Sequence, residues 1–259
     1  MEAMRRRDFM KGIAGSATAW PLTAHTQPKW PTFAQLQQTP MHLVQQAYSL
    51  ESWGEFRRMM MTGNFSPKIK LDEVMARHPT VGVGAVSDAR GEISIFDGKL
   101  VISYGKAGPS TEATSEYAAL LTIGSTSDWQ SAPVEQDIAP EMVESYIATA
   151  AKARGIDAEK SFPFEVRGNI GPYVMHVNAA PTGGPHGMGL PMAITVQNTG
   201  DRIDGLVTGL YVSSDLIGIA THGGERTHAH WVSLDARSTA HLDRWGLSAG
   251  AYLLLPKLA

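Results

Sequence analysis

Three of the nine histidines of the chain, His228, His230 and His241, lie in one short stretch near its C-terminal end. His228 and His230 are two residues apart, so on a β-strand both side chains leave the same face. If the chain turns back at the polar residues 235–238, His241 lies opposite His230 on the next strand, and directly paired residues share a face. The three imidazoles then converge, which is the geometry of a three-histidine metal site with a position left for water or substrate.

A chance cluster of histidines on a polar strand face is the alternative to a metal site. The third histidine, at the cross-strand position, favours the metal site. The chain contains no cysteine, so histidine and carboxylate are the only strong metal ligands that it can offer. His222 and Glu225 precede the strand and could serve as auxiliary ligands. Gly223 and Gly224 lie between them and make this segment a loop, so a place in the loop, or a contact to the ligands rather than to the ion, fits them better.

The residues around this stretch must form the strands that position it. Besides the histidine hairpin, the C-terminal pattern predicts strands over 162–167, 173–178, 192–197, 205–211, 216–221 and 251–255. The N-terminal pattern predicts helices over 42–48, 51–62 and 69–78, a hairpin of 92–96 with 99–104 around an Asp-Gly turn, and a polar connection over 122–136. A helix is expected over 140–154. This order indicates an α+β protein with two β-sheet-containing halves, at about 43–135 and 160–259, joined by that helix.

The composition allows one substantial globular unit or two small ones. Of the 259 residues, 43% are hydrophobic and 18% are charged, and the formal net charge is -3. No basic block occurs beyond the extreme N-terminus, which argues against a nucleic-acid-binding surface. No stretch is long and apolar enough to span a bilayer, so no stable membrane span is expected. We expect a small-molecule substrate as the partner.

Residues 1–26 match a signal for twin-arginine export. An Arg-Arg-x-Phe-x-Lys pattern begins at Arg6, and a mildly apolar run rich in glycine and alanine follows, with small residues that could form a cleavage site. The alternative is a basic amphipathic start to a cytoplasmic domain. We expect the twin-arginine export machinery to carry the protein to the periplasm or out of the cell, with a linker over 27–42 and one domain over 43–259.

The spacing of the three histidines, His-x-His followed by ten residues and a further His, resembles the motif of the acetolactate decarboxylase family. Residues 81–99, a glycine-rich segment that runs into a Gly-Glu strand and an Asp-Gly turn, are similar to a second segment of that family. Residues 204–211 are similar to its strand ahead of the histidines. The likeness extends from about residue 43 to the end of the chain, and the triad is its most specific part.

The resemblance implies a fold of two related β-rich halves, with the metal site on the C-terminal half. It implies a zinc ion held by His228, His230 and His241, although imidazoles also accept other divalent transition metals, and it implies a homodimer. Glu92 aligns with a family glutamate that faces the metal from the other half, which makes it the candidate catalytic acid or base. The implied activity is that of a carbon–carbon lyase, which decarboxylates 2-acetolactate or a similar 2-hydroxy-3-oxo acid to an acetoin-type product.

Two departures from the family pattern leave other functions open. The family has a substrate-holding arginine after the strand that corresponds to residues 173–178, and this chain has none there. The family also has a glutamate well past its last histidine, whereas this chain has none after Glu225, so Glu225 or Asp243 could take that place. Glu225 is therefore a candidate substrate contact, as is His186, which lies in a loop rich in glycine and proline.

The alternatives are a divergent member of the family that acts on another small oxyacid or ketol, and a non-catalytic periplasmic metal-binding protein. A cupin also carries His-x-His on a strand. Its pattern expects a glutamate a few residues later and flanking glycines, where this chain has Asp235 and no such glycines.

Overall fold

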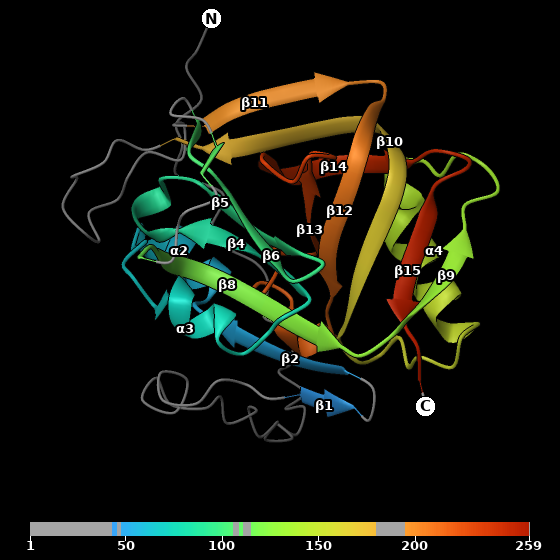
Figure 1. The fold of residues 1–259 in the computed structure, drawn as a ribbon, viewed down its shortest axis with the longest axis horizontal. Coiled ribbons are helices and arrows are strands. Elements are labelled where there is room, and N and C mark those ends of the chain that lie inside the picture. The colour runs from blue at the N-terminus through green and yellow to red at the C-terminus, as the bar shows by residue number, and fades with distance from the viewer. Residues whose placement is uncertain (1–42, 46–47, 106–108, 111–114, 180–194, 259) are drawn as a thin grey trace, which may run out of the picture. The chain divides into compact units, whose positions relative to one another are not determined.

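Two antiparallel β-sheets dominate the part of the chain that the computed structural model describes, which is residues 43–45, 48–105, 109–110, 115–179 and 195–258 (Figure 1). The first sheet has the order β1-β2-β8-β4-β5-β6-β7, with β3 paired to β8. Its strands are β1 (Leu43–Gln45), β2 (Tyr48–Trp53), β3 (Ile69–Lys70), β4 (Val81–Val86), β5 (Glu92–Phe96), β6 (Lys99–Ser103), β7 (Pro109–Ser110) and β8 (Tyr117–Thr126).

The second sheet has the order β12-β13-β14-β10-β15-β9, with β11 paired to β10 and a further pairing of β12 with β10. Its strands are β9 (Trp129–Pro133), β10 (Phe162–Asn178), β11 (Thr195–Gly200), β12 (Ile203–Tyr211), β13 (Thr227–Val232), β14 (Thr239–Leu247) and β15 (Tyr252–Pro256). The expected α+β fold with two β-sheet-containing halves is confirmed.

Short helices complete both halves. These are α2 (Phe56–Thr62), α3 (Leu71–Met75) and α4 (Val143–Lys152), with the 3-10 turns η1 (Ser87–Ala89), η3 (Pro140–Met142) and η4 (Ser214–Leu216). The expected helix over 140–154 is confirmed as η3 followed by α4, which buries Val143, Ile147 and Ala151 in the core of the second sheet. In the described part of the chain, no helix has the length and apolar character needed to cross a membrane.

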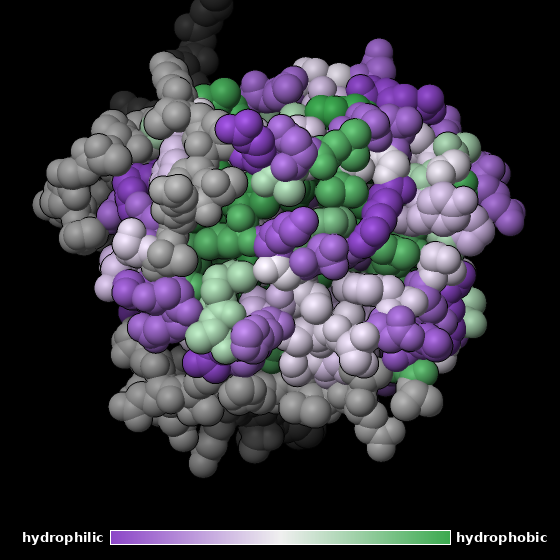
Figure 2. Space-filling model, viewed as in Figure 1, coloured by the Kyte–Doolittle hydropathy of each residue, from purple (hydrophilic) through white to green (hydrophobic). Residues whose placement is uncertain are grey.

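The first sheet is covered on both of its faces, which explains why every residue of β4 is buried. On one face, Ile93 lies in a hydrophobic cluster with Leu71 of α3. On the other face, Val83 lies in a cluster with Leu210 of β12, which belongs to the second sheet. Figure 2 shows apolar surface in the middle of this view, over the strands where the two sheets meet, with hydrophilic side chains around it.

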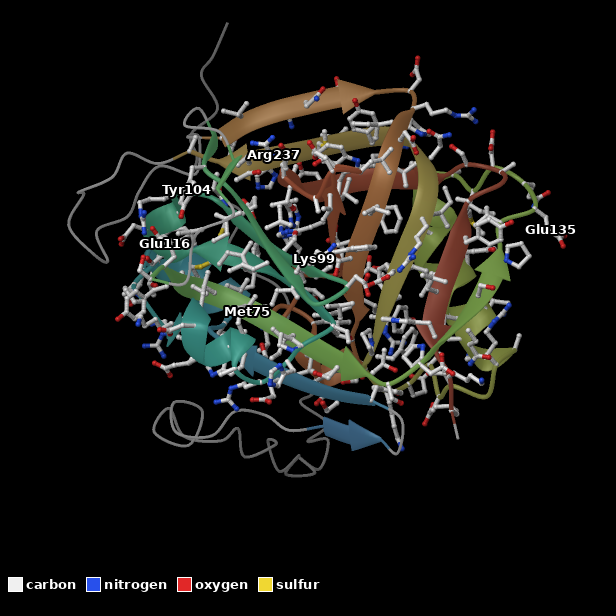
Figure 3. All side chains as sticks on the ribbon, in the orientation of Figure 1. Met75, Lys99, Tyr104, Glu116, Glu135 and Arg237 are labelled. Atoms are coloured by element: carbon white, nitrogen blue, oxygen red, sulfur yellow. The ribbon has the colours of Figure 1, made fainter. Side chains whose placement is uncertain are left out.

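The hairpin of β5 and β6 faces strands β12, β13 and β14 of the second sheet. In Figure 3, Lys99 and Tyr104 mark the two ends of β6. The Thr208 hydroxyl donates a hydrogen bond of 2.8 Å to the carbonyl of Ile95, and the backbone N–H of Thr239 donates one of 2.8 Å to Ser103 Oγ. These bonds hold β5 and β6 against the second sheet, with Glu92 at the first position of β5.

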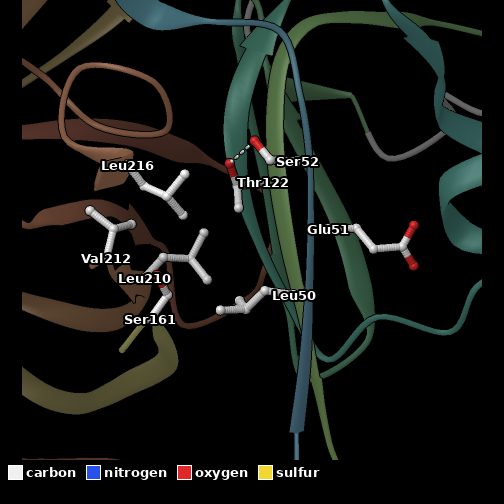
Figure 4. Close-up of a pocket in the computed structure, with 8 residues that line it drawn as sticks. All are labelled: Leu50, Glu51, Ser52, Thr122, Ser161, Leu210, Val212 and Leu216. Carbon is white, nitrogen blue, oxygen red and sulfur yellow. Dashed lines mark hydrogen bonds between the residues drawn. The ribbon is translucent and has the colours of Figure 1, made fainter. Parts of the chain in front are cut away.

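The interface also contains a cavity of about 10 Å³, the size of one water molecule, which is too small for a substrate (Figure 4). In this view Leu50 of β2 points toward Leu210, while Glu51 points away from it. Ser52 and Thr122 share a hydrogen bond of 2.8 Å between their hydroxyls. Successive residues of β2 therefore face opposite sides, as a strand requires.

Strand β10 changes partner along its length. Its first part pairs with β12 from Phe162 to Ile170, and its last part pairs with β11 and β14. The change occurs around Gly168 and Gly171, whose φ angles are 124° and 154°. A Cβ on Gly171 would lie 2.0 Å from the carbonyl oxygen of Asp201, so only glycine fits there.

The N-terminal helix expectations are partly wrong. The expected helix over 42–48 is wrong because Leu43–Gln45 forms strand β1. The helix expected over 51–62 begins only at Phe56, because β2 extends to Trp53 and pairs with β8. In the third expected helix, over 69–78, β3 precedes the short helix α3. Pairing with β8 therefore outweighs the local helical preference.

Further along, the polar connection expected over 122–136 is wrong, because β8 extends to Thr126 and β9 follows. The strands expected over 162–167 and 173–178 form the single strand β10. The strand expected over 216–221 is wrong, because η4 and a turn occupy these residues. Strand β11 covers Thr195–Gly200, and residues 192–194 of the strand expected there lie outside the described residues.

Candidate metal centre

The expected histidine hairpin is formed by β13 and β14. His230 pairs directly with His241, which confirms the cross-strand prediction, and His228 pairs with Leu210 of β12. One potential ligand atom from each of His228, His230 and His241 lies within 4.8 Å of the others. All three imidazoles are buried, with exposed fractions of 4%, 0% and 5%. The structure therefore brings three imidazoles to one point beneath the surface.

Contacts at both ends of β13 hold the hairpin in place. At its start, the Glu144 carboxylate of α4 accepts hydrogen bonds from the backbone N–H groups of Arg226 and Thr227, at 2.6 and 3.0 Å. At its end, Asp235 accepts hydrogen bonds from the Ser233 hydroxyl and from the Arg237 N–H, at 2.6 and 3.1 Å. An Asp side chain that bonds nearby backbone is typical of a tight turn, and this one returns the chain so that His241 meets His230.

Burial keeps the three imidazoles neutral. It lowers the pKa of His228 to about 3, with a further contribution from His222, and it lowers the pKa values of His230 and His241 well below the ordinary value. Neutral imidazole has one nitrogen lone pair free to bind a metal ion. For His228 that atom is Nε2, because Nδ1 donates a hydrogen bond of 2.9 Å to the carbonyl of Ala220.

The Nε2 nitrogen of His230 gives a direct test of whether the site fits a metal ion. This atom is buried and has no hydrogen-bond partner among the described residues. A buried polar atom without a partner costs free energy, and such atoms call for an explanation in a folded protein. A divalent metal ion bound by three imidazole nitrogens accounts for it, so the triad could bind a metal.

Glu92 faces the triad from β5 of the first sheet. Its Oε2 lies 3.8 Å from His230 Nε2 and its exposed fraction is 2%. Burial raises the pKa of Glu92 to about 8, against the opposing effects of His176 and of hydrogen bonds from Asn178. The backbone N–H of Asn178 and its Nδ2 both donate to Oε1, at 3.2 and 2.5 Å. The carboxyl group is therefore oriented, with Oε1 held by Asn178 and Oε2 toward the imidazoles.

A second imidazole–carboxylate pair lies beside Glu92. His176 Nδ1 lies 2.8 and 2.9 Å from the two carboxylate oxygens of Asp243, and His176 Nε2 lies 3.8 Å from Glu92 Oε1. Burial alone would lower the pKa of His176, but the hydrogen bond to Asp243 and the charges of Glu92 and Asp243 outweigh it and raise the pKa. His176 on β10 pairs with His241 on β14, so adjacent strands place the two histidines next to each other.

His222 packs over the triad from the loop that precedes β13. Its ring stacks on His241 with a centroid distance of 4.8 Å and on Phe56 of α2 with a centroid distance of 4.1 Å. Burial lowers the pKa of His222. Two backbone hydrogen bonds of 2.8 Å, from Phe56 to Ile219 and from Arg57 to Gly218, hold this loop against the start of α2.

A pocket of about 270 Å³ lies beside the triad, and His228 and His241 line it while His230 lies behind them, outside the lining that the described residues form. One wall is apolar and comes from α2 and the first half: Phe56, Met59, Met60, Phe65 and Leu120. The other wall is polar: Glu92, His176, Asn178, His222, His228, His241 and Asp243. The pocket can thus present a small molecule to the triad on one side and hold its hydrocarbon part on the other.

The candidate site residues from the sequence are placed as follows. His228, His230, His241 and Glu92 come together. Glu225 is exposed and is not among the described residues that line the pocket. His186 lies outside the described residues. The contacts proposed for Glu225 and His186 stay predictions.

Sequence analysis misses Asn178, and it favours a surface or structural role for His176 over a catalytic one. Both side chains reach the site because β10 pairs with β14 and crosses near β5, which no local pattern reveals. Asp243 had a usable signal, because it lies two residues after His241 and therefore on the same face of β14. It had been considered only as a substitute for a missing family glutamate.

The chain matches no family model and no curated protein. Solved structures that it is similar to include the following three. One is a Staphylococcus aureus protein of unknown function described as similar to alpha-acetolactate decarboxylase, with a TM-score of 0.66 and 14% identity over 81% of this chain and 85% of that chain. Another is alpha-acetolactate decarboxylase from Bacillus subtilis strain 168, with a TM-score of 0.63 and 14% identity over 80% and 85%.

The third is acetolactate decarboxylase from Bacillus subtilis subspecies spizizenii, with a TM-score of 0.61 and 12% identity over 80% of this chain and 85% of that chain. At these identities the similarity shows the fold alone. The chain therefore has an acetolactate-decarboxylase-like fold, as the resemblance implied.

Proposed function

We propose that the chain is a metal-dependent carbon–carbon lyase that decarboxylates 2-acetolactate, or a similar small 2-hydroxy-3-oxo acid, to an acetoin-type product. The observation that carries the proposal is the buried triad of neutral imidazoles with the Glu92 carboxyl group across from it, beside a pocket that Glu92, His228 and His241 line. The fold shared with acetolactate decarboxylases supports the same reaction class.

In this reaction the bond to the carboxylate breaks, carbon dioxide leaves, and the electron pair remains next to the neighbouring carbonyl until a proton replaces the lost carboxylate. His228, His230 and His241 would hold the metal ion, which we propose to be zinc. When bound, the ion supplies a Lewis acid that withdraws negative charge from the substrate oxygens. Three neutral ligands leave the full charge of the ion available for this purpose.

Glu92 moves the proton. Because its Oε1 accepts two hydrogen bonds from Asn178, the proton of the neutral acid lies on Oε2, the oxygen that faces the imidazoles. A positioned acid of this kind contributes roughly 10²–10⁴-fold to a rate. The apolar wall, with Met59 and Phe65, excludes water and holds the alkyl groups of the substrate.

His176 supplies a polar contact for the substrate on the same wall as Glu92. Asp243 accepts a hydrogen bond from His176 Nδ1, which sets the orientation of the ring and leaves Nε2 toward the pocket.

One feature favours a different small oxyacid or ketol as the substrate. Within the described residues, those that line the pocket include no arginine or lysine. A substrate carboxylate would therefore have no permanent side-chain cation of the protein as its partner. A ketol, or an acid bound wholly through the metal ion and the histidines, is the second candidate. A non-catalytic metal-binding protein is the third candidate function for a chain with this triad.

Export is part of the proposal. Residues 1–26 would direct the protein through the twin-arginine machinery to the periplasm or beyond, and a homodimer is the proposed assembly. Replacement of Arg6 and Arg7 by lysine should leave the precursor in the cytoplasm, as measured by cell fractionation and immunoblot. Unchanged export of that variant would contradict the proposed signal.

The lyase assignment is tested on the purified protein by an assay of acetoin released from 2-acetolactate, with and without a chelator, and by elemental analysis of the same preparation. Stoichiometric metal with chelator-sensitive acetoin release is the expected result. Stoichiometric metal without acetoin would favour another oxyacid or ketol. A preparation that binds metal and turns over none of these compounds would favour the non-catalytic protein.

A further inference from the structure

A buried chain of hydrogen bonds links His230 to the opposite sheet. Ser94 of β5 places its Oγ 3.1 Å from His230 Nδ1 and 2.5 Å from Thr239 Oγ1. Ser94, His230 and Thr239 have exposed fractions of 0%, 0% and 1%. Ser94 belongs to the first sheet, whereas His230 and Thr239 lie on the hairpin of the second sheet. A residue of one half therefore contacts a candidate metal ligand of the other half.

The direction of each hydrogen bond follows from the partners. The Thr239 hydroxyl lies 2.8 Å from the carbonyl oxygen of Trp231, which can only accept, so the threonine donates its proton there. Thr239 Oγ1 must then accept the proton of Ser94. Ser94 has one proton, so its oxygen accepts from His230 at Nδ1.

These hydrogen bonds favour the proton on Nδ1 of His230, and the backbone of Ile93 also hydrogen-bonds this ring. The neutral ring is protonated at Nδ1 and has its lone pair at Nε2. Nε2 is the buried atom that has no partner among the described residues, and it is the atom that lies 3.8 Å from Glu92. The opposite tautomer would point an N–H, rather than a lone pair, at the position of a metal ion.

We propose that Ser94, oriented by Thr239, is a positioning residue of the metal centre, which holds His230 in its Nδ1–H tautomer with Nε2 free to bind the ion. The first sheet then contributes to metal affinity without supplying a ligand, because the tautomer depends on the docking of β5 against the hairpin. The inference rests on the proposed metal site, and it does not depend on which substrate is used.

The sharpest variant is Thr239→Val, which leaves His230 and Ser94 untouched. Without the threonine acceptor, the Ser94 proton is free to donate to His230 Nδ1, which favours the Nε2–H tautomer. Ser94→Ala removes the acceptor for Nδ1–H directly. Loss of an outer hydrogen-bond partner of a metal ligand weakens metal affinity by about 10- to 100-fold, and we expect this range for both variants. Thr239→Ser keeps the hydroxyl, so this variant should bind the metal with wild-type affinity.

Ser103→Ala is the matched control. Ser103 Oγ accepts a hydrogen bond of 2.8 Å from the backbone N–H of Thr239, so this variant also loses a buried bond between the two sheets. It leaves the hydrogen bonds of Ser94 to His230 and Thr239 intact. If Ser94 serves only to hold the sheets together, Ser103→Ala should weaken metal binding as much as Ser94→Ala does.

The experiment measures zinc affinity by competition with a chromophoric chelator, and the His230 tautomer in the metal-free protein by ¹⁵N NMR of the ring nitrogens. Circular dichroism verifies that each variant folds. We expect Nδ1–H in the wild type, a shift toward Nε2–H in Thr239→Val, and weakened zinc binding in Thr239→Val and Ser94→Ala but not in Ser103→Ala or Thr239→Ser.

Two outcomes would overturn the inference and are distinguishable. Folded Ser94→Ala and Thr239→Val variants that bind zinc with wild-type affinity would overturn the role of Ser94 and leave the metal site standing. A wild-type protein that binds no zinc would contradict the metal site itself, and the positioning role with it.

Discussion

Asn178 donates two hydrogen bonds to one oxygen of Glu92, from its backbone N–H at 3.2 Å and from its Nδ2 at 2.5 Å. These bonds join the end of β10 to the start of β5, so a residue of the second sheet orients the candidate acid of the first. The other oxygen of Glu92 is left toward His230. The relationship makes the proton-transfer step depend on both halves of the chain.

Asn178→Ala should therefore slow turnover without loss of metal. The backbone bond remains and the side-chain bond is lost, so we expect kcat to fall about 10-fold, the effect of one hydrogen bond. Glu92→Gln should lower kcat by about 10² or more. In the Glu92→Gln background, Asn178→Ala should have no further effect, because Asn178 acts through Glu92. Fully additive losses in kcat, measured at unchanged metal content, would contradict this arrangement.

His176→Gln should weaken substrate binding. The variant removes the imidazole that Asp243 orients toward the pocket, and we expect KM to rise about 10-fold while zinc content stays unchanged. Asp243→Asn should show a similar change, because Asp243 acts by holding His176. Arg244→Gln is the control, since the exposed Arg244 pairs with Glu141 outside the pocket. A KM that changes equally in the control and in His176→Gln would remove His176 from substrate binding.

Glu165 should make folding stability depend on pH. It is fully buried on β10, where it accepts a hydrogen bond from the Asp97 N–H, and burial raises its pKa from 4.5 to about 7. Between these pH values the folded protein binds more protons than the unfolded chain, so the free energy of unfolding falls as pH rises. The maximum contribution is about 3 kcal/mol, and it is fully present below pH 4.5.

Glu165→Gln removes this titration and keeps a hydrogen-bond acceptor for Asp97. Urea unfolding of both proteins from pH 4 to pH 8, with chelator present, should show the wild type losing stability relative to the variant as pH rises. Parallel stability curves for the two proteins would show that Glu165 does not titrate in this range.

The histidine hairpin could be predicted from sequence because all of its information is local. His-x-His has the strand period, a polar turn follows, and that turn brings His241 opposite His230. Glu92 was different: its strand was predicted, but its role came only from the family resemblance. Nothing in its neighbouring residues indicates that the second sheet covers it.

The rest of the site depends on contacts between distant residues. His176 and Asn178 reach the pocket through the long strand β10, whose course requires glycine at Gly171 and pairing with β14. Strand β8 was missed because its second half is rich in serine, threonine and glycine, and the hydroxyl of Thr122 finds its partner on β2. Polar residues that are buried and satisfied by distant partners look like a surface loop in the sequence.

The most direct test of the account is the metal content of single histidine variants. The experiment loads each protein with zinc, dialyses it and measures the bound metal. The proteins are the wild type, His228→Ala, His230→Ala, His241→Ala and a control, His78→Ala, which alters an exposed histidine just after α3. We expect about one zinc per chain in the wild type and in His78→Ala, and loss of tightly bound zinc in each of the other three, because each loses one of the three proposed protein ligands. A folded variant at position 228, 230 or 241 that retained stoichiometric zinc would contradict the proposed metal centre.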